Sequence, residues 1–504
     1  MPIGTREVFK TYTDEETFAK IKEYDSLSEM WKEAVASYGA DHIMIKDNGS
    51  EYTYADVEKE AAVFRAVLAG KGLSKGDRVG IIAVNSYEAV RAFIAVVTSG
   101  MTAVMLPPHL DERTIFGCCM KFSLKAVVFD DSAKERVGLA GSKFAVINVN
   151  ETTDGSAEAV SVAAEDEAVI MFTGGTTGSS KGALLTNRAL MQGVTNGCYG
   201  YKDVFNQRYI LLLPLFHVFG LIRNTLTPVM TGSTLWICRN TKDMFKDIAI
   251  FRPTVMVAVP AMVEMAYGLS KQFGKQMLGP DMKYIICGAA NVPPYLIEEY
   301  YKDGILVLAG YGLTETANLV SGNPDSVKAP ESVGKLFPNQ EVKLVDGEIW
   351  IKGSNIMSGY IGEEENPFED GWFRTGDLGR FDEEGYLYIT GRIKEIIVLP
   401  TGENVSPAEL EAKFNTVKLI QDSQVFEAIT EDGRHILALE VVPRASETAK
   451  LPKEEVAETI LRELRAVNET IPSAQRVTKM TIRDKDFDRT PSMKIVRYKN
   501  AVQS

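Results

Sequence analysis

Apolar residues in the N-terminal two thirds of the chain form short continuous runs, separated by stretches with helical spacing. The runs at 79–84, 103–106 and 126–129 are almost wholly apolar, which is typical of strands buried on both faces of a parallel sheet. Thr53 and Ser86 are suitable N-caps for the two helices that precede and follow the first run. This alternation predicts an α/β fold with a parallel-rich sheet covered on both faces.

The same pattern recurs at residues 168–172, 210–213, 254–259, 284–287 and 305–309. The longest apolar stretch, residues 209–222, contains a proline and a histidine and is too short to cross a bilayer, which takes about 20 apolar residues. We interpret it as a buried strand that runs into a loop, and we predict no integral membrane segment.

The pattern changes between residues 333 and 390, where short alternating strands and Asp-Gly or Glu-Gly turns predict a small β-barrel or meander. After Gly391 a strand at 395–399 leads to Ser406, which, with Pro407 and Glu409, forms a predicted capping box. We therefore predict two domains. Residues 1–391 form a large N-terminal domain of several α/β subdomains, and residues 392–504 form a smaller α+β domain.

Composition excludes some classes of function. The chain has 504 residues and a formal net charge of −13, so it lacks the basic surface that nucleic-acid binding requires. Its five cysteines have no metal-ligand spacing, and the first ten residues do not resemble a signal peptide. These features favour a soluble cytoplasmic protein with reduced thiols.

The segment 172–182 (FTGGTTGSSKG) is the most informative for chemistry, and it directly follows a predicted buried strand. Glycines let backbone N–H groups approach phosphate oxygens, while hydroxyls and a lysine add donors and charge. A nucleoside triphosphate would suit this loop, although it lacks the Walker pattern. A flexible Gly/Ser/Thr linker is the less favoured reading. The candidate phosphate-binding residues are Thr173, Gly174, Gly175, Thr176, Thr177, Gly178 and Lys181.

Five further segments follow in order: 214–220 (PLFHVFG), 310–316 (GYGLTET), 374–377 (RTGD), 391–395 (GRIKE) and 490–495 (TPSMKI). With the glycine-rich loop they resemble the adenylate-forming superfamily of acyl-CoA synthetases, carrier-loading adenylation domains and firefly luciferase, over roughly residues 53–499. The resemblance implies that residues 1–391 are an adenylation domain, that the C-terminal domain is mobile, and that the active site lies between the two.

The resemblance also implies roles for single residues. The glycine-rich loop would hold the β- and γ-phosphates. Glu315, assisted by Thr176, would bind Mg²⁺. Lys494 would be the catalytic cation of adenylation, and Lys394 would be the hinge of the mobile domain. The remaining assignments are Gly288, Ala289, Ala290, Tyr311, Gly312 and Thr314 for AMP, Asp377 and Arg392 for the ribose, and Gly402, Glu403 and Asn404 for the pantetheine of coenzyme A.

The acyl pocket is assigned to Gly310 and to His217, Val218 and Phe219, of which His217 is counted with Glu315 and Lys494 as catalytic. A buried core histidine is an equally good reading of His217. Amino-acid-activating relatives commonly have an aspartate just there, so its absence argues against an amino-acid substrate. The apolar neighbours favour a medium- or long-chain fatty acid.

The expected activity is ATP- and Mg²⁺-dependent formation of an acyl-adenylate, with release of pyrophosphate, followed by acyl transfer to coenzyme A. The partners would then be a small carboxylic acid, ATP and coenzyme A. The alternatives are an aryl-acid ligase and a ligase that loads a separate acyl-carrier protein, with a luciferase-like oxygenase less favoured. From a different class, a catalytically silent nucleotide-binding protein is opposed by the presence together of Lys181, Glu315, Asp377, Arg392 and Lys494.

Overall fold

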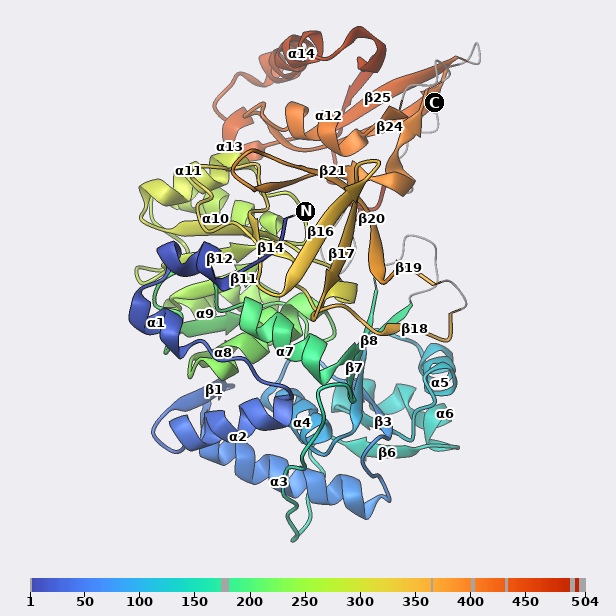
Figure 1. The fold of residues 1–504 in the computed structure, drawn as a ribbon. Coiled ribbons are helices and arrows are strands. Elements are labelled where there is room, and N and C mark those ends of the chain that lie inside the picture. Colours follow the sequence, from blue (N-terminus) through green and yellow to red (C-terminus); the bar gives the residue numbers. More distant parts are fainter. Residues whose placement is uncertain are drawn as a thin grey trace.

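A computed structural model describes residues 2–173, 181–363, 366–399, 404–430, 434–489 and 495–497. The N-terminal helices α2 (Leu27–Tyr38), α3 (Tyr54–Gly70) and α4 (Tyr87–Thr98) lie at one end of the molecule, and the C-terminal domain lies at the other (Figure 1). An antiparallel sheet lies between these ends. The mixed α/β architecture and the separate C-terminal domain confirm the predicted fold class.

The first α/β unit contains a seven-stranded sheet, most of whose strands run parallel. The N-caps predicted from the sequence are confirmed, because the hydroxyls of Thr53 and Ser86 accept hydrogen bonds from the first turns of α3 and α4. The strands, in sheet order, are β18 (Gly359–Ile361), β8 (Gly182–Thr186), β7 (Glu167–Phe172), β4 (Thr102–Leu106), β3 (Arg78–Ile82), β5 (Ala126–Phe129) and β6 (Ala145–Asn148).

The second α/β unit contains a nine-stranded sheet with a parallel centre, β12–β11–β9–β10. Helices α9 (Met244–Phe251), α10 (Pro260–Phe273) and α11 (Pro294–Lys302) share a hydrophobic core with this sheet. Helix α7 (Asn187–Asn196) contacts β7 and β8 of the first sheet. The strands, in sheet order, are β15 (Lys335–Leu336), β14 (Ser321–Gly322), β13 (Leu306–Tyr311), β12 (Tyr284–Cys287), β11 (Val255–Ala258), β9 (Arg208–Leu211), β10 (Thr234–Ile237), β1 (Ile43–Asp47) and β2 (Ser50–Thr53).

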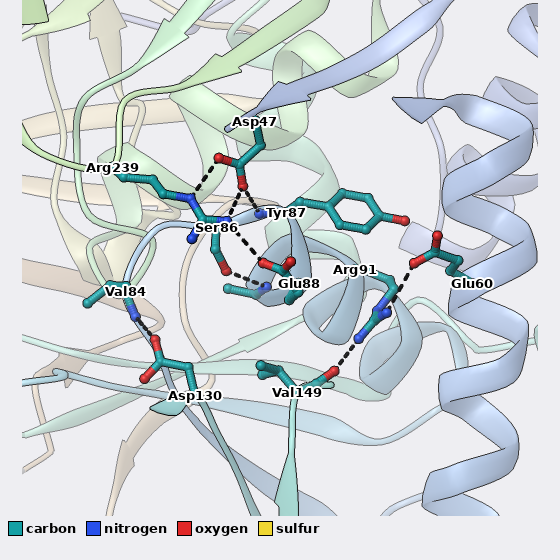
Figure 2. A network of polar contacts seen from close by, with 11 residues as sticks. Asp47, Glu60, Val84, Ser86, Tyr87, Glu88, Arg91, Asp130, Val149 and Arg239 are labelled. Carbon is teal, nitrogen blue, oxygen red and sulfur yellow. Dashed lines mark hydrogen bonds and ion pairs between the residues drawn. The ribbon is translucent and has the colours of Figure 1, made fainter. Parts of the chain in front are cut away.

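A polar network around the buried carboxylate of Asp47 lies between these two units (Figure 2). Asp47, at the end of β1, accepts two hydrogen bonds of 2.7 Å from Arg239 and one of 2.8 Å from the backbone N–H of Tyr87 in α4. Arg91, further along α4, pairs with Glu60 of α3 at 3.1 Å. The bidentate pair with Arg239 lies within the second unit and orients the Asp47 carboxylate. The bond from the N–H of Tyr87 to that carboxylate then connects the two units.

Residues 333–390 were expected to form a small β-barrel or meander, and the meander is the better description. An antiparallel sheet has the order β16 (Gln340–Val345), β17 (Glu348–Gly353), β20 (Trp372–Phe381), β19 (Phe368–Glu369), with β21 (Leu387–Arg392) also on β20. No pairing between described residues closes it into a barrel, because β15 and β18 leave to join the other two sheets. Alternating polarity predicts the strands but not their distant partners.

The apolar stretch 209–222 differs from its prediction. It begins as strand β9, as expected, but after the turn at Pro214 the chain enters a π-helix, η3 (Phe219–Leu226), that continues into α8 (Thr227–Met230). A π-helix has no distinct spacing signal in so short a segment, and such helices are frequent at functional sites. Among the described residues, no helix is both long and apolar enough to cross a membrane.

The C-terminal domain is an α+β unit with its own core. Its three-stranded sheet has the order β24 (Ile420–Ile429), β25 (His435–Pro443), β26 (Lys479–Ile482), and α12 (Pro407–Phe414) and α14 (Lys453–Glu469) pack on it. Ser406 caps α12 as predicted, accepting a hydrogen bond from the N–H of Glu409. The return bond from the Glu409 side chain, which would complete the predicted capping box, is not formed between these described residues. The domain boundary near residue 391 stays a prediction.

A small polar cluster connects the C-terminal domain to α10 and α11. The guanidinium of Arg444 lies 3.0 Å from Oε1 of Glu264, and the hydroxyl of Tyr295 donates to the same oxygen at 2.7 Å. The guanidinium carbon of Arg444 also lies 4.2 Å from the centre of the Tyr295 ring. Arg444 is buried, so this polar contact between the domains is shielded from solvent.

Candidate active site

The segment 310–316 places two candidate side chains at the end of a buried strand. Tyr311 is the last residue of β13, and Glu315 lies in the 3₁₀ turn η5 (Thr314–Thr316) that follows. Gly312 between them is required by packing, because a Cβ atom there would lie 1.5 Å from the carbonyl oxygen of Asn318. The turn therefore packs directly against the backbone at Asn318, and this contact fixes Glu315 relative to Tyr311.

Tyr311 contacts the predicted ribose-binding residues. Its hydroxyl donates to Oδ2 of Asp377 at 2.7 Å, and Nε of Arg392 donates to Oδ1 at 2.5 Å. Asp377 and Arg392 are register partners on β20 and β21, so the sheet itself places them side by side. Burial, and then the Asp377 carboxylate, raise the pKa of Tyr311 well above its usual value, so the phenol stays neutral and donates.

Glu315 contacts a residue that the sequence did not single out. The hydroxyl of Tyr360, on β18, donates to Oε1 of Glu315 at 2.6 Å. The ammonium of Lys181 lies 4.8 Å from the centre of the Tyr360 ring, within the range of a cation–π contact. Tyr360 thus connects the acidic residue of one segment to the lysine of the glycine-rich segment.

The glycine-rich loop closes the β7–β8 hairpin. The N–H of Thr173 donates to the carbonyl oxygen of Lys181 at 2.9 Å, and Phe172 pairs with Gly182 in the sheet. Lys181, the first described residue after the loop, therefore lies beside Tyr360, because β8 pairs with β18. The candidate residues Gly174, Gly175, Thr176, Thr177 and Gly178 lie outside the described residues.

The predicted acyl and adenine residues are brought close together. A Cβ atom built on Gly288 would lie 3.5 Å from the Phe219 ring and 3.5 Å from the carbonyl oxygen of Gly310. Phe219 and Val218 are partly buried against the main core, and the rings of His217 and Phe216 are 4.4 Å apart. Ala289 has a left-handed φ of 68°, and it and Ala290 are exposed beyond β12. Strained backbone of this kind is common at binding sites.

The residues assigned to the domain motion and to coenzyme A are only partly described. Lys394 lies exposed in the turn η6 (Ile393–Glu395), two residues after Arg392, and Asn404 begins β23 (Asn404–Val405). Gly402, Glu403 and Lys494 lie outside the described residues. Just beyond Lys494, Arg497 pairs with Glu411 of α12, which anchors this part of the chain to the C-terminal domain.

The side chains present fit magnesium delivered with a nucleotide. Among the described residues there is no cluster of three or more His, Cys, Asp or Glu that could hold a metal ion. Mg²⁺ needs no such cage when phosphates and water fill most of its coordination sphere, because one or two carboxylates are then enough. Glu315, partly buried and close to Lys181 through Tyr360, is a suitable single carboxylate.

Two side chains at or near the site were not predicted from the sequence, namely Tyr360 and Arg223. Tyr360 had no signal, since it lies 45 residues after Glu315 in a segment without a motif. Arg223 gave a weak sequence signal, because it is a single positively charged residue directly after the longest apolar stretch.

Comparison with known proteins gives two family matches. The model of the AMP-binding enzyme family matches residues 31–361, and the model of the AMP-binding enzyme C-terminal domain matches residues 394–503. Among curated proteins, the chain is 30% identical over 428 residues to the 4-coumarate–CoA ligase-like 6 of Arabidopsis thaliana, covering 75% of this chain and 74% of that protein. It is 27% identical over 534 residues to a long-chain-fatty-acid–CoA ligase of Salmonella typhimurium, covering 88% and 94%.

Among solved structures, the chain resembles the anthranilate CoA ligase AuaEII in complex with anthranoyl-AMP. The TM-score is 0.82 at 19% identity, and the match covers 95% of this chain and 96% of that one. At this level of identity, the likeness establishes the shared fold.

Proposed function

The chain belongs to the AMP-binding enzyme family, and we propose that it joins a carboxylic acid to coenzyme A through an acyl-adenylate. The observation that carries this proposal is a pair of hydrogen bonds, from Tyr311 to Asp377 and from Tyr360 to Glu315. Tyr311 ends β13, and Glu315 lies four residues later in the turn η5. These contacts bring a candidate nucleoside site and a candidate phosphate site to the same end of β13. The reacting phosphorus would lie between them.

The buried carboxylate of Asp377 suits the ribose diol. It is 3% exposed, and each of its oxygens accepts one hydrogen bond from the protein. An ionised carboxylate has about four acceptor positions, so two remain for ribose hydroxyls. Arg392 and Tyr311 hold the carboxylate in one orientation, which lowers the cost of binding the nucleoside.

The residues around Glu315 and Tyr360 suit the triphosphate of ATP. Lys181 and the backbone of the glycine-rich loop would neutralise and bind the β- and γ-phosphates. Mg²⁺ bound with ATP would be held by Glu315 and would supply further positive charge there. Tyr360 would orient the Glu315 carboxylate, in the way that outer hydrogen bonds orient metal ligands generally.

We assign the two half-reactions to two positions of the C-terminal domain. In the first, Lys494 would stabilise negative charge as the acid's carboxylate oxygen bonds to the α-phosphorus and pyrophosphate leaves. In the second, rotation about Lys394 would bring residues 402–404 to the site, and the thiol of coenzyme A would displace AMP from the acyl carbon. Such gating keeps two incompatible steps in order.

The class of carboxylic acid depends on the residues of the acyl pocket. The sequence favours a medium- or long-chain fatty acid, with an aryl acid as the alternative, and the relatives named above include ligases of both kinds. Phe216, Leu221 and Ile222, however, belong to the hydrophobic core, so their apolar character does not by itself favour an alkyl chain.

The proposed function is tested by thioester formation. Purified protein is given ATP, Mg²⁺ and a panel of aliphatic, aromatic and dicarboxylic acids, with coenzyme A and a purified acyl-carrier protein as alternative acceptors. An acyl-CoA product and equimolar AMP are expected. Absence of acid-dependent pyrophosphate exchange with every acid would support the catalytically silent alternative, and acylation of the carrier alone would support the carrier-loading one.

A further inference from the structure

A small cavity lies behind the strand that carries Tyr311. Its volume is about 40 Å³, and its wall includes Leu308, Gly310, Asn323, Phe337 and Arg223. Gly310 is the residue immediately before Tyr311, and Arg223 comes from the π-helix that starts at Phe219. Gly310 and Phe219 both belong to the predicted acyl pocket, so the cavity adjoins that pocket.

Arg223 is deeply buried in this wall. It is 2% exposed, and its stem packs where α7 ends, since a Cβ atom built on Gly197 would lie 3.1 Å from Cδ of Arg223. One terminal nitrogen, Nη2, donates to the hydroxyl of Tyr201 at 3.0 Å. The other, Nη1, is buried and has no hydrogen-bond partner among the described residues.

The surroundings of Arg223 supply no negative charge. Its guanidinium lies over the rings of Tyr201 and Tyr209, at 5.4 and 6.0 Å from their centres. Burial raises the pKa of Tyr201 well above its usual value, so this phenol is neutral near pH 7. The phenol faces are favourable for a cation but do not replace a counter-ion.

Arg223 differs from the other buried arginines in having no carboxylate partner among the described residues. Four arginines are buried in the described part of the chain, namely Arg65, Arg91, Arg223 and Arg444. The other three each form an ion pair, with Glu58, Glu60 and Glu264 respectively. The groups that interact electrostatically with Arg223 are Tyr201 and Tyr209, and no described carboxylate is among them. A guanidinium stays charged in proteins, and burying it without a counter-charge is costly.

We propose that the acid substrate carries a second carboxylate, which enters this cavity and pairs with Arg223. The substrate class is thus a short dicarboxylic acid, and the inference rests on the proposed ligase function. One carboxylate would react at the α-phosphorus, forming the oxygen–phosphorus bond as the bond to pyrophosphate breaks. The thiol sulfur would then bond to the acyl carbon as AMP leaves with the bonding electron pair, and the thiol proton would pass to solvent. The second carboxylate stays ionised and unchanged throughout.

The size of the cavity supports a short acid. Pockets that enclose drug-sized or lipid ligands are typically about 300–1,000 Å³. A cavity of about 40 Å³ accepts a group of a few atoms, such as a carboxylate, but no long alkyl chain. Phe337 closes part of the wall and is itself buried in the core.

The test is selectivity between matched acids. Acid-dependent exchange of pyrophosphate into ATP is measured for straight-chain dicarboxylic acids of three to six carbons and for the monocarboxylic acids of equal length. We expect kcat/KM of the wild-type protein to be about 100-fold higher for the best dicarboxylic acid than for its monocarboxylic match, because a site built around a polar partner rejects the analogue lacking it.

Variants then assign that selectivity to Arg223. Arg223→Met keeps an unbranched apolar stem and removes the guanidinium with its charge. It should therefore lose about 100-fold for the dicarboxylic acid while the monocarboxylic rate is unchanged or rises. Arg223→Lys, which keeps the charge, should retain part of the preference. Arg65→Met removes an equally buried guanidinium outside the cavity, and should leave the ratio of the two rates at its wild-type value.

Each outcome decides the question. A wild-type preference for monocarboxylic acids overturns the substrate assignment and leaves the ligase function standing, whereas no exchange with any acid of either class overturns the ligase function itself. An equal loss for both acids in soluble Arg223→Met would make Arg223 structural and overturn its role. If that variant is insoluble, the wild-type panel and Arg223→Lys decide in the same way.

Discussion

The hydroxyl of Tyr360 and the carboxylate of Glu315 form a hydrogen bond of 2.6 Å across 45 residues of sequence. Tyr360 lies on β18, which pairs with β8, the strand that follows the glycine-rich loop. One short edge strand therefore connects the proposed magnesium carboxylate to Lys181, the proposed phosphate-binding lysine. Their relative position does not depend on the C-terminal domain.

Removing this hydroxyl should weaken metal-dependent adenylation. In Tyr360→Phe the Glu315 carboxylate loses the hydrogen-bond donor that orients it. Removing a residue that hydrogen-bonds to a metal ligand generally reduces metal affinity or activity by about 10- to 100-fold. We expect the Mg²⁺ concentration for half-maximal pyrophosphate exchange to rise about 10-fold. Tyr388→Phe removes a similar phenol–carboxylate bond, to Asp382, and serves as the control. Equal effects of the two substitutions would contradict the assignment.

The buried carboxylate of Asp377 gives a second prediction. Asp377→Asn keeps the shape but removes the charge, and should reduce kcat/KM for ATP by about 10- to 100-fold, the usual worth of a hydrogen bond to a charged group. With 3′-deoxy-ATP, which lacks one ribose hydroxyl, the substitution should cost clearly less, because the two changes remove the same contact. Additive losses would place the ribose elsewhere.

How far the sequence predicts this molecule depends on the range of the interactions. Helix starts at Thr53, Ser86 and Ser406 are set by a side chain and an N–H three residues away, and all three are found. The bond from Tyr360 to Glu315 and the missing counter-charge of Arg223 depend on which strands become neighbours. No local pattern encodes that, so these features required the fold.

The C-terminal lysine gives a prediction that separates the two half-reactions. Lys494→Ala should reduce acyl-adenylate formation by at least about 100-fold, because it removes a preorganised charge from the transition state. Thioester formation from synthetic acyl-adenylate and coenzyme A should stay near the wild-type rate. The two rates are measured separately on the same preparation, and an equal loss in both would show that Lys494 is not specific to adenylation.

The contact between the domains predicts that the free energy of unfolding depends on pH through Glu264. Burial raises the pKa of Glu264 above its ordinary value of 4.5, against the opposing effects of Tyr295 and Arg444. The folded protein therefore binds this proton more tightly than the unfolded chain does, so the stability contribution is full below pH 4.5 and decreases as pH rises through the raised pKa. The free energy of urea unfolding of the wild type, minus that of Glu264→Gln, should fall as the pH rises above 4.5.

A neighbouring carboxylate provides a control of opposite sign. Lys271 and Lys302 lower the pKa of Glu299 to about 2, so its stabilising contribution is present above pH 4.5 and is lost as the pH falls toward 2. The corresponding difference for Glu299→Gln should therefore rise with pH below 4.5 and then level off. The same pH slope for both variants would contradict these assignments.

The fate of the carboxylate oxygen tests the central claim most directly. An acid substrate labelled with ¹⁸O in its carboxylate is converted to thioester with ATP and coenzyme A, and the AMP is examined by mass spectrometry. Attack of the carboxylate on the α-phosphorus predicts one ¹⁸O atom in the phosphate of AMP for each thioester formed. Unlabelled AMP, or label recovered in inorganic phosphate together with ADP, would contradict an acyl-adenylate.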